Sequence, residues 1–335
     1  MQTTQFRLLC TALLLVLLTS CVPYSDFTLP KQPGGALPKW TLNLSANPVM
    51  ARGKSGDFDD IDALNPSVIR RGATLWNLYS GYDGKTWHTG LATSSNGAVW
   101  EKKGKVLSPD PSTWEGDYIA ANGSLIEQNG QLLYFYQGGR VPSIGLARSA
   151  DGLHWMKEPT PVLPAGPHGS WDERGVADPY AVLVDGTLYL YFLGQDRARR
   201  QRLGVAISQD GGLHWKKLRA NPVLDLGETG AFDEQGLGEP AVWVSSGYYW
   251  MLYTGRDKSE HRRMGLAYSL DGVHWSRTAG NPFAGGADWN RDVVCDATVL
   301  LDGGKVRVWY GGGNRPLPAE GLNGQIGSAV LEGDW

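Results

Sequence analysis

The sequence predicts an all-β fold, a five-bladed β-propeller of four-stranded blades in which the N-terminal strand closes the ring by pairing into the last blade. Three observations predict it. One polar turn occurs four times, a second phrase occurs five times, and the two ends of the chain hold complementary parts of an incomplete repeat. The 45 glycines and 14 tryptophans suit short strands joined by tight turns and pinned by large aromatic side chains.

The first repeated element is a turn of the form SxDG that ends on a tryptophan. It reads SSNGAVW at 94–100, SADGLHW at 149–155, SQDGGLHW at 208–215 and SLDGVHW at 269–275. These turns recur about every 55 to 60 residues, slightly longer than the repeats of known propellers. Because Ser and Asp bond local backbone and Gly supplies unusual dihedral angles, we expect a structural corner whose tryptophan packs between blades.

The second repeated element is a phrase in which an aromatic residue comes before an acid or amide and an apolar strand. A Gly-containing turn, a strand such as LYLYFLG and a strand such as LGVAIS follow it, so each repeat holds four strands. The SxDG turn joins the third strand to the fourth. Regular spacing favours packing of the aromatic residues within the blades over stacking on a ligand. The five phrases begin at Phe58, Trp114, Trp171, Phe232 and Trp289.

The two ends of the chain predict how the ring closes. The last repeat ends after its third strand, at SAVLEGDW, whereas the chain body begins with a lone fourth strand at Trp40. Pairing these strands would remove the exposed edges of the ring. Two stacked sandwiches are the alternative, but they do not predict matching incomplete ends. The predicted propeller domain covers residues 40–335.

The N-terminus is predicted to be a targeting segment. Arg7 precedes the run LLCTALLLVLL, which is too short for a comfortable transmembrane span, and LTSC at 18–21 follows. This end resembles the lipobox of bacterial lipoproteins, whose cysteine is acylated. The resemblance implies a signal peptide at 1–20, lipidation of Cys21 and a proline-containing tether at 21–39. A secretory signal with a chance cysteine is the alternative.

Localisation and redox state follow from the same segment. The resemblance implies a lipid-anchored protein of the bacterial cell envelope, in the outer membrane of a Gram-negative cell because Val22 rather than Asp follows the cysteine. Cys10 lies in the removed segment, so Cys295 is left alone and no disulfide within the mature chain is expected. Cys295 lies in an apolar run and is expected to be a small buried hydrophobe. The net charge of -3 argues against a nucleic-acid partner.

Alignment of the first strands places one polar residue of each blade at the same position. Because first strands line the central channel of a propeller, we expect these five side chains to meet around one axis. Gathering like charges without water is costly, which favours a functional site over a channel mouth capped with ordered water. The five residues are Asn65, Asn122, Asp178, Glu239 and Asp296.

The run WDERGVADPYAVL, LYLYFLG, LGVAIS and DGGLHW is similar to the five-bladed propeller glycoside hydrolases of families 43, 32, 68, 117 and 130. The resemblance covers essentially all of residues 40–335. Those enzymes carry an Asp, a second Asp and a Glu on the first strands of three successive blades. The resemblance implies that Glu239, in a Glu-Pro pair, is the general acid, and that Asp178, in an Asp-Pro pair, tunes that acid or stabilises the transition state. It implies cleavage of an oligosaccharide or polysaccharide.

The sequence departs from this family pattern at Asn122. The blade before Asp178 should carry the base or nucleophile there, and an amide can be neither. Asp117, in the loop before that strand, or Asp296 is predicted to supply the missing carboxylate, and Asp62 and Asp292 are further candidates. The residues predicted to contact the substrate are Asp62, Asn65, Asn122, Arg174, Arg197, Arg256 and Asp292.

Two basic loops at the same position of neighbouring blades predict an anionic substrate. They read DRARRQR at 196–202 and RDKSEHRR at 256–263, and Arg140 and Arg315 lie in equivalent loops. Guanidinium groups match planar anions, which favours recognition of a uronate, sulfate or phosphate over a merely solvated surface. Phosphate would indicate a phosphorylase like those in family 130.

The remaining motifs limit the alternatives. The SxDG turn resembles the Asp-box of sialidases, which lies on the outer rim, so His154, His214 and His274 in these turns are expected to be structural. No HExxH, CxxC pair, P-loop or strand-following GxGxxG occurs, so no metal or other cofactor is expected. A non-catalytic propeller that binds glycan and a scaffold in an envelope complex are the alternatives to a glycosidase.

Overall fold

The computed structural model describes residues 24–334, and within this range it contains strands and turns but no helix. The predicted all-β class is confirmed. Apart from β1 (Tyr24–Ser25), the strands pair into five four-stranded groups, here called units 1 to 5. Each unit is antiparallel, and in units 1 to 4 the four strands follow one another along the chain.

Unit 1 contains β3 (Asp62–Arg71), β4 (Thr74–Tyr82), β5 (Trp87–Ser94) and β6 (Glu101–Leu107). Unit 2 contains β7 (Ala120–Gln128), β8 (Gln131–Gly138), β9 (Ser143–Ser149) and β10 (Met156–Lys157). Unit 3 contains β11 (Gly175–Val184), β12 (Thr187–Gln195), β13 (Gln201–Ser208) and β14 (Lys216–Leu218). Unit 4 contains β15 (Gly236–Ser245), β16 (Tyr248–Arg256), β17 (Arg262–Ser269) and β18 (Ser276–Arg277). Unit 5 contains β19 (Val293–Asp302), β20 (Lys305–Gly313), β21 (Gln325–Asp334) and β2 (Lys39–Leu44).

The N-terminal strand completes the last unit. β2 pairs antiparallel with β21 over six residues, from Lys39 opposite Asp334 to Leu44 opposite Ala329. The predicted pairing of the two ends of the chain is therefore present. It covers the outer edge of β21 with strand that comes from the far end of the sequence.

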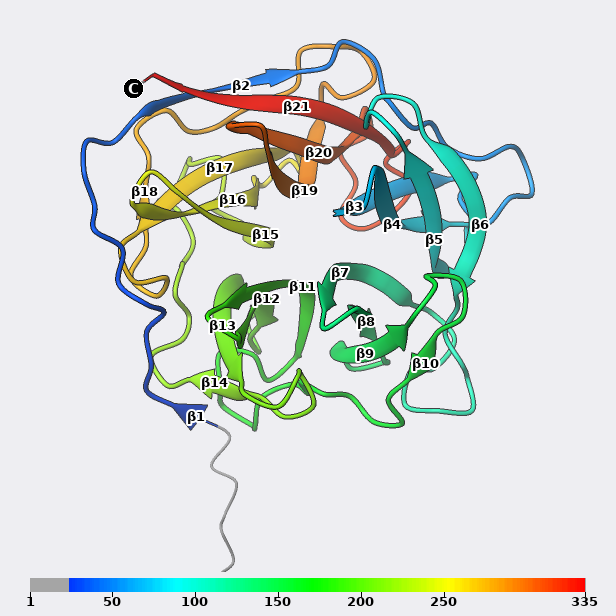
Figure 1. Cartoon of the computed structure of the whole chain (residues 1–335), viewed down its shortest axis with the longest axis horizontal. Coiled ribbons are helices and arrows are strands. Elements are labelled where there is room, and N and C mark those ends of the chain that lie inside the picture. Colours follow the sequence, from blue (N-terminus) through cyan, green and yellow to red (C-terminus); the bar gives the residue numbers. More distant parts are fainter. Residues whose placement is uncertain (1–23, 335) are drawn as a thin grey trace, which may run out of the picture.

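The five units surround a common centre. β3, β7, β11, β15 and β19 lie innermost, and the fourth strand of each unit lies outermost (Figure 1). Each innermost strand contacts the innermost strands of both neighbouring units, and β19 contacts β3. Single parallel bridges also join the third strand of one unit to the innermost strand of the next, for example Gln201 of β13 with Gly236 of β15 and Arg262 of β17 with Val293 of β19. Residues far apart in sequence thus meet at the centre.

The hydrophobic core is divided among the contacts between units. Five buried clusters each join the side chains of two neighbouring units, including unit 5 with unit 1. Tryptophans of the repeated turn take part in this packing. The Trp215 ring packs edge-on against Phe135 of unit 2, and Trp275 packs edge-on against Tyr191 of unit 3. The spacing of the turns is therefore explained by inter-unit packing.

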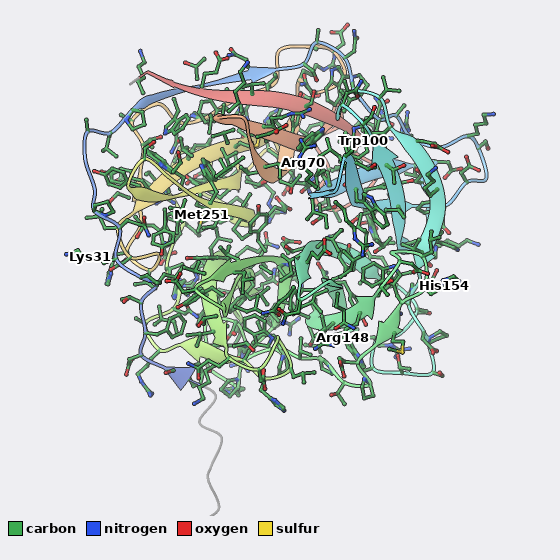
Figure 2. All side chains as sticks on the ribbon, in the orientation of Figure 1. Lys31, Arg70, Trp100, Arg148, His154 and Met251 are labelled. Carbon is green, nitrogen blue, oxygen red and sulfur yellow. The ribbon has the colours of Figure 1, made fainter. Side chains whose placement is uncertain are left out.

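The SxDG turn is a structural corner. In the second copy the N–H groups of Leu153 and His154 both donate to Asp151 Oδ1 at 2.9 Å, and the Gly152 N–H donates to Ser149 Oγ at 2.8 Å. The His154 ring lies 2.8 Å from Asp151 Oδ2 and is exposed at the outer edge of the molecule (Figure 2). The rings of His214 and His274 contact their own turn aspartates in the same way, which agrees with a structural role.

Asp271 in the fourth copy of this turn makes stability depend on pH. Burial acts to raise its pKa, but hydrogen bonds from His274 and Val273 outweigh burial and lower the pKa from 3.8 to about 2. A depressed pKa in the folded state contributes stability above the unfolded-state pKa, and this is lost as the pH falls toward 2. We expect Asp271→Asn to lose less unfolding free energy between pH 5 and pH 2 than the wild type does, as measured by urea denaturation.

The natural control for that substitution is Asn96, which fills the same place in the first turn. Its side-chain oxygen accepts hydrogen bonds from the N–H groups of Ala98 and Val99 at 2.8 and 3.0 Å, so an amide fits the turn. If the free energy of unfolding falls equally with pH in the wild type and in Asp271→Asn, the acid sensitivity does not come from this carboxylate.

The repeated aromatic-acid phrase ties the strands of each unit together. In units 1 to 4 its acid is buried and accepts a hydrogen bond from a cation on the fourth strand of the same unit. In unit 3, for example, Lys217 Nζ lies 2.5 Å from Asp172. Unit 5 has Asn290 at this position, which donates to the Tyr310 hydroxyl instead. The other pairs are Asp59 with Lys102, Glu115 with Lys157 and Asp233 with Arg277, at 2.6, 2.7 and 2.9 Å.

Residues 24–35, within the segment predicted to be a tether, lie against units 3 and 4. β1 pairs with β14, Leu29 is buried, and the Gly34 N–H donates to the Gly247 carbonyl at 2.9 Å. The predicted signal peptide and Cys21 lie outside the described residues. Within residues 24–334, no helix is long and apolar enough to cross a membrane.

Candidate active site

Each innermost strand contains one β-bulge at the same place. In β3 the pairing with β4 shifts between Leu64 and Ser67, and the other four innermost strands shift at the equivalent point. The first residue of each bulge has a positive φ, which is uncommon for a residue other than glycine. These residues, with their φ angles, are Asn65 (48°), Asn122 (49°), Asp178 (48°), Glu239 (45°) and Asp296 (56°).

These are the five aligned polar residues, and the structure brings them together. All five line one small cavity at the centre of the ring, along with Pro66, Pro179 and Pro240, which follow three of them. A bulge re-aims its side chain relative to the regular alternation of a strand. Five strained backbone positions that meet at one point are typical of a functional site rather than of folding alone.

A larger cavity of about 240 Å³ shares three of these residues. Asn122, Asp178 and Glu239 line both cavities. The wall of the larger cavity also includes the arginines Arg174, Arg256 and Arg262, the glutamines Gln137, Gln195 and Gln201, the aromatic residues Trp87 and Tyr118, and Glu320. It combines carboxylates, planar cations, amides and aromatic rings, which is a set suited to a polar ligand with apolar faces.

The pKa values of Asp178 and Asp296 are raised in this site. Burial raises the pKa of Asp178 well above its ordinary value, the charges of Glu239 and Asp296 raise it further, and Arg262 opposes them. Burial and the Glu239 charge likewise raise the pKa of Asp296. Because one charge of the cluster penalises the next, we expect it to retain at least one proton at neutral pH.

Two buried polar atoms of the site have no hydrogen-bond partner within the part of the chain that the structure describes. They are Glu239 Oε2 and Asn122 Oδ1. Both residues line the two central cavities. Buried polar atoms are nearly always paired, so these two atoms are left for water or a bound ligand as their partner.

Comparison with known proteins indicates which fold this is. Residues 143–287 match the family of the glycosyl hydrolases family 32 N-terminal domain. A family 117 glycoside hydrolase of the marine bacterium Zobellia galactanivorans superposes with a TM-score of 0.65 at 16% identity, covering 88% of this chain and 90% of that one. The chain has the fold of these glycoside hydrolases.

Two further relatives share the glycoside hydrolase fold or part of the sequence. One is a structure from the GH130 family of mannoside phosphorylases, a family described as containing glycoside hydrolases that target β-1,2 mannosidic linkages in Candida mannan. It superposes with a TM-score of 0.69 at 16% identity, and the alignment covers 91% of this chain and 96% of that one. An uncharacterized protein of Mycobacterium tuberculosis is 27% identical over 229 residues, which is 64% of this chain and 74% of that protein.

Some residues predicted to contact substrate support the glycoside hydrolase fold instead of lining its cavities. Asp62 is fully buried and accepts hydrogen bonds from the backbone N–H groups of Gly321, Leu322 and Gly324. Asp292 lies 3.2 Å from Arg291. Neither is among the residues that line the two central cavities.

Asp117 and Arg197 also lie away from both cavities. Asp117 is exposed, and its backbone carbonyl accepts a hydrogen bond from the Thr86 hydroxyl. Arg197 is exposed and pairs with Glu173 at 3.5 Å. Neither lines the central cavities, and the exposed Arg140 and Arg315 do not line them either.

The three arginines that line the larger cavity differ in how many hydrogen bonds their guanidinium groups already make. Arg256 donates to Gln201 at 2.8 Å and to Glu260 at 3.0 Å, and Arg262 donates to the carbonyls of Leu317 and Pro318. Arg174 is exposed and makes no side-chain hydrogen bond or ion pair within residues 24–334. Its guanidinium is the one of the three that is free to bind an anion.

Sequence reasoning did not single out Arg262 or Glu320. Arg262 lies inside the basic run 256–263 and is the first residue of β17. The sequence did not show where this strand begins, so it did not distinguish Arg262 from the other basic residues of the run. Glu320 lies in the loop between β20 and β21, which is longer than the loops at the same place in the other units. No group of three or more His, Cys, Asp or Glu in residues 24–334 is arranged to hold a metal ion.

Proposed function

We propose that this protein is a glycoside hydrolase whose five units are the blades of a β-propeller closed by β2. The closed cycle of contacts among the innermost strands and the pairing of β2 with β21 support the propeller. The match of residues 143–287 to glycosyl hydrolases supports the activity class. The substrate is an oligosaccharide or polysaccharide bound in the larger cavity.

One observation carries this proposal: Glu239 and Asp178 line the same cavity, and Glu239 Oε2 has no partner there among the described residues. Glycosidic cleavage needs an acid that gives a proton to the leaving oxygen. We assign this role to Glu239. Asp178 is its positioning partner, because it lines the same cavity and the charge of Glu239 raises the pKa of Asp178.

The second carboxylate of the reaction is not supplied by Asp296 in this proposal. Burial and the Glu239 charge raise the pKa of Asp296, which favours its protonated form, and a protonated carboxyl cannot accept a proton from water. Asp117 is exposed and lies outside the cavity wall. Asp296 instead belongs to the buried cluster, where its Oδ2 accepts a hydrogen bond from the Asn65 N–H at 3.2 Å.

The arginines on the cavity wall favour an anionic sugar. Arg174, Arg256 and Arg262 all line the cavity, and Arg174 keeps its donors free. A uronate or sulfate on the substrate would satisfy this side of the cavity. The same feature supports a second candidate, a phosphorylase, because inorganic phosphate would then be the attacking group. The likeness to a GH130 structure supports that candidate as well.

We further propose that the mature chain begins at Cys21 and is anchored by lipid in the bacterial cell envelope, after removal of residues 1–20. The LTSC sequence at 18–21 supports this.

The test is turnover by the purified protein on a panel of neutral, uronate-containing and sulfated glycans, each with and without inorganic phosphate. We expect new reducing ends from an acidic glycan in the absence of phosphate. A sugar phosphate that forms only with phosphate present would assign the phosphorylase. Binding on a glycan array without any cleavage would assign a binding protein, and an absence of both would favour a scaffold.

A further inference from the structure

The long loop of residues 314–324, between β20 and β21, brings a carboxylate to the cavity from outside the innermost strands. Asp62 of β3 fixes one side of this loop through three backbone hydrogen bonds, at 2.6 Å from Gly321, 2.7 Å from Gly324 and 3.3 Å from Leu322. Gly321 directly follows Glu320. A buried carboxylate that accepts three N–H groups holds the adjoining backbone rigidly.

Two arginines of the site hold the other side of the same loop. Arg262 donates to the carbonyls of Leu317 and Pro318 at 3.2 and 3.1 Å, and Arg256 donates to the Pro318 carbonyl at 3.4 Å. The loop is therefore fixed between unit 1 and unit 4. Glu320, which lies between the two anchored parts, is positioned on the cavity wall.

The partners of Glu320 place its carboxylate on the side of units 1 and 2. The Tyr118 hydroxyl, before β7, donates to Oε2 at 3.2 Å, and the Tyr82 hydroxyl, at the end of β4, donates to Oε1 at 3.4 Å. The Tyr82 ring is stacked on Trp87, which lines the cavity, with centroids 4.9 Å apart. Burial and the Glu320 charge raise the pKa of Tyr118 to about 12, so the phenol remains a donor.

This is the side of the cavity where Asn122 stands in place of the carboxylate expected from the related enzymes. Asn122 belongs to unit 2, four residues after Tyr118, and lines the same cavity as Glu320. Glu239 belongs to unit 4. The three carboxyl residues on the wall of the larger cavity are Asp178, Glu239 and Glu320, and only Glu320 comes from outside the central ring of bulges.

We infer that Glu320 is the catalytic base of the proposed hydrolysis and takes the place of the carboxylate that Asn122 lacks. This inference rests on the proposed function. Each Glu320 oxygen has a second lone pair beyond its tyrosine bond, which is available to a water molecule in the cavity.

The chemical step balances with water as the sole co-reactant. Glu320 takes a proton from water while the water oxygen forms a bond to the anomeric carbon. The bond from that carbon to the leaving oxygen breaks, and the leaving oxygen takes the proton of Glu239. The products are two sugars with free hydroxyls. Glu320 then carries the extra proton and Glu239 lacks one, and exchange with solvent resets both.

The experiment compares Glu320→Gln, Glu320→Ala and Glu239→Gln on the acidic glycan that the wild type cleaves. We expect Glu320→Gln to lower kcat by about 10²- to 10⁴-fold, the usual contribution of a general base, with KM little changed. Sodium azide needs no base, so it should restore cleavage by Glu320→Ala and yield a glycosyl azide. The matched control is Glu101→Gln, an exposed carboxylate on the outer strand β6, which should keep wild-type turnover.

Other outcomes separate this inference from the proposed function. Turnover that is lost in Glu239→Gln but stays within threefold of the wild type in Glu320→Gln overturns the role of Glu320 alone. A raised KM at unchanged kcat, or a loss that azide does not restore, shows a binding or structural role and also overturns it. Failure of the wild type to cleave any glycan overturns both the role of Glu320 and the glycosidase itself.

Discussion

Glu239→Gln is expected to lower the rate of glycan cleavage by about 10²- to 10⁴-fold, because an amide cannot protonate the leaving oxygen. Gln has nearly the shape of Glu, so the bulge and the cavity should persist. We therefore expect the variant to bind the intact glycan with an affinity within severalfold of the wild type. Reducing-end assays give the rate, and titration calorimetry gives the affinity.

The control for this prediction is a substrate with a good leaving group, such as an aryl glycoside of the same sugar. Such a group needs little protonation, so the loss in Glu239→Gln should be much smaller on it than on the natural linkage. An equal loss on both substrates would show that Glu239 is not the acid. Undiminished turnover of the glycan would remove Glu239 from the chemistry altogether.

Asp172→Ala is expected to lower the free energy of unfolding by about 3 to 5 kcal/mol, the usual result of removing one partner of a buried ion pair. Asp172 is fully buried and Lys217 is 5% exposed, and their side chains lie 2.5 Å apart. Burial lowers the pKa of Lys217 and Asp172 opposes that change. Without Asp172 the ammonium group keeps, among the residues that the structure describes, one hydrogen-bond partner, the Pro164 carbonyl at 2.7 Å. Urea denaturation measures the change.

Two variants make this stability test specific. Asp172→Ala combined with Lys217→Met removes both charges and should recover much of the lost free energy. Glu101→Ala removes an exposed carboxylate and should change stability little. Equal destabilisation by the single and double variants would show that the cost comes from lost packing around Trp171 and not from an uncompensated charge.

The repeats made the central part of the site predictable. The five positions are aligned in the repeats, and they remain equivalent in three dimensions because each is the first residue of the bulge in its innermost strand. They are Asn65, Asn122, Asp178, Glu239 and Asp296. The Asp-Pro and Glu-Pro pairs marked two of them. The bulges and positive φ angles that aim the side chains at one cavity are not encoded by any single residue type, so the sequence pattern alone did not predict them.

Proximity in sequence was a poor guide for the other carboxylates. Asp62 lies three residues before Asn65 on the same strand, and alternation turns it toward the 314–324 loop instead of the cavity. Glu320 shows the opposite case. It lies in a loop that is longer than its equivalents in the other units, and it reaches the cavity because Asp62, Arg256 and Arg262 fix that loop. Such long-range anchoring leaves no local pattern.

The most direct test of the account is mass spectrometry of the products formed in H₂¹⁸O by the wild type and by Glu239→Gln. The central claim is that the carboxylates of the cavity direct water to an anomeric carbon. It predicts one ¹⁸O atom at each new reducing end from the wild type and far fewer labelled ends from the variant. Products without label, or equal labelling by both proteins, would contradict it.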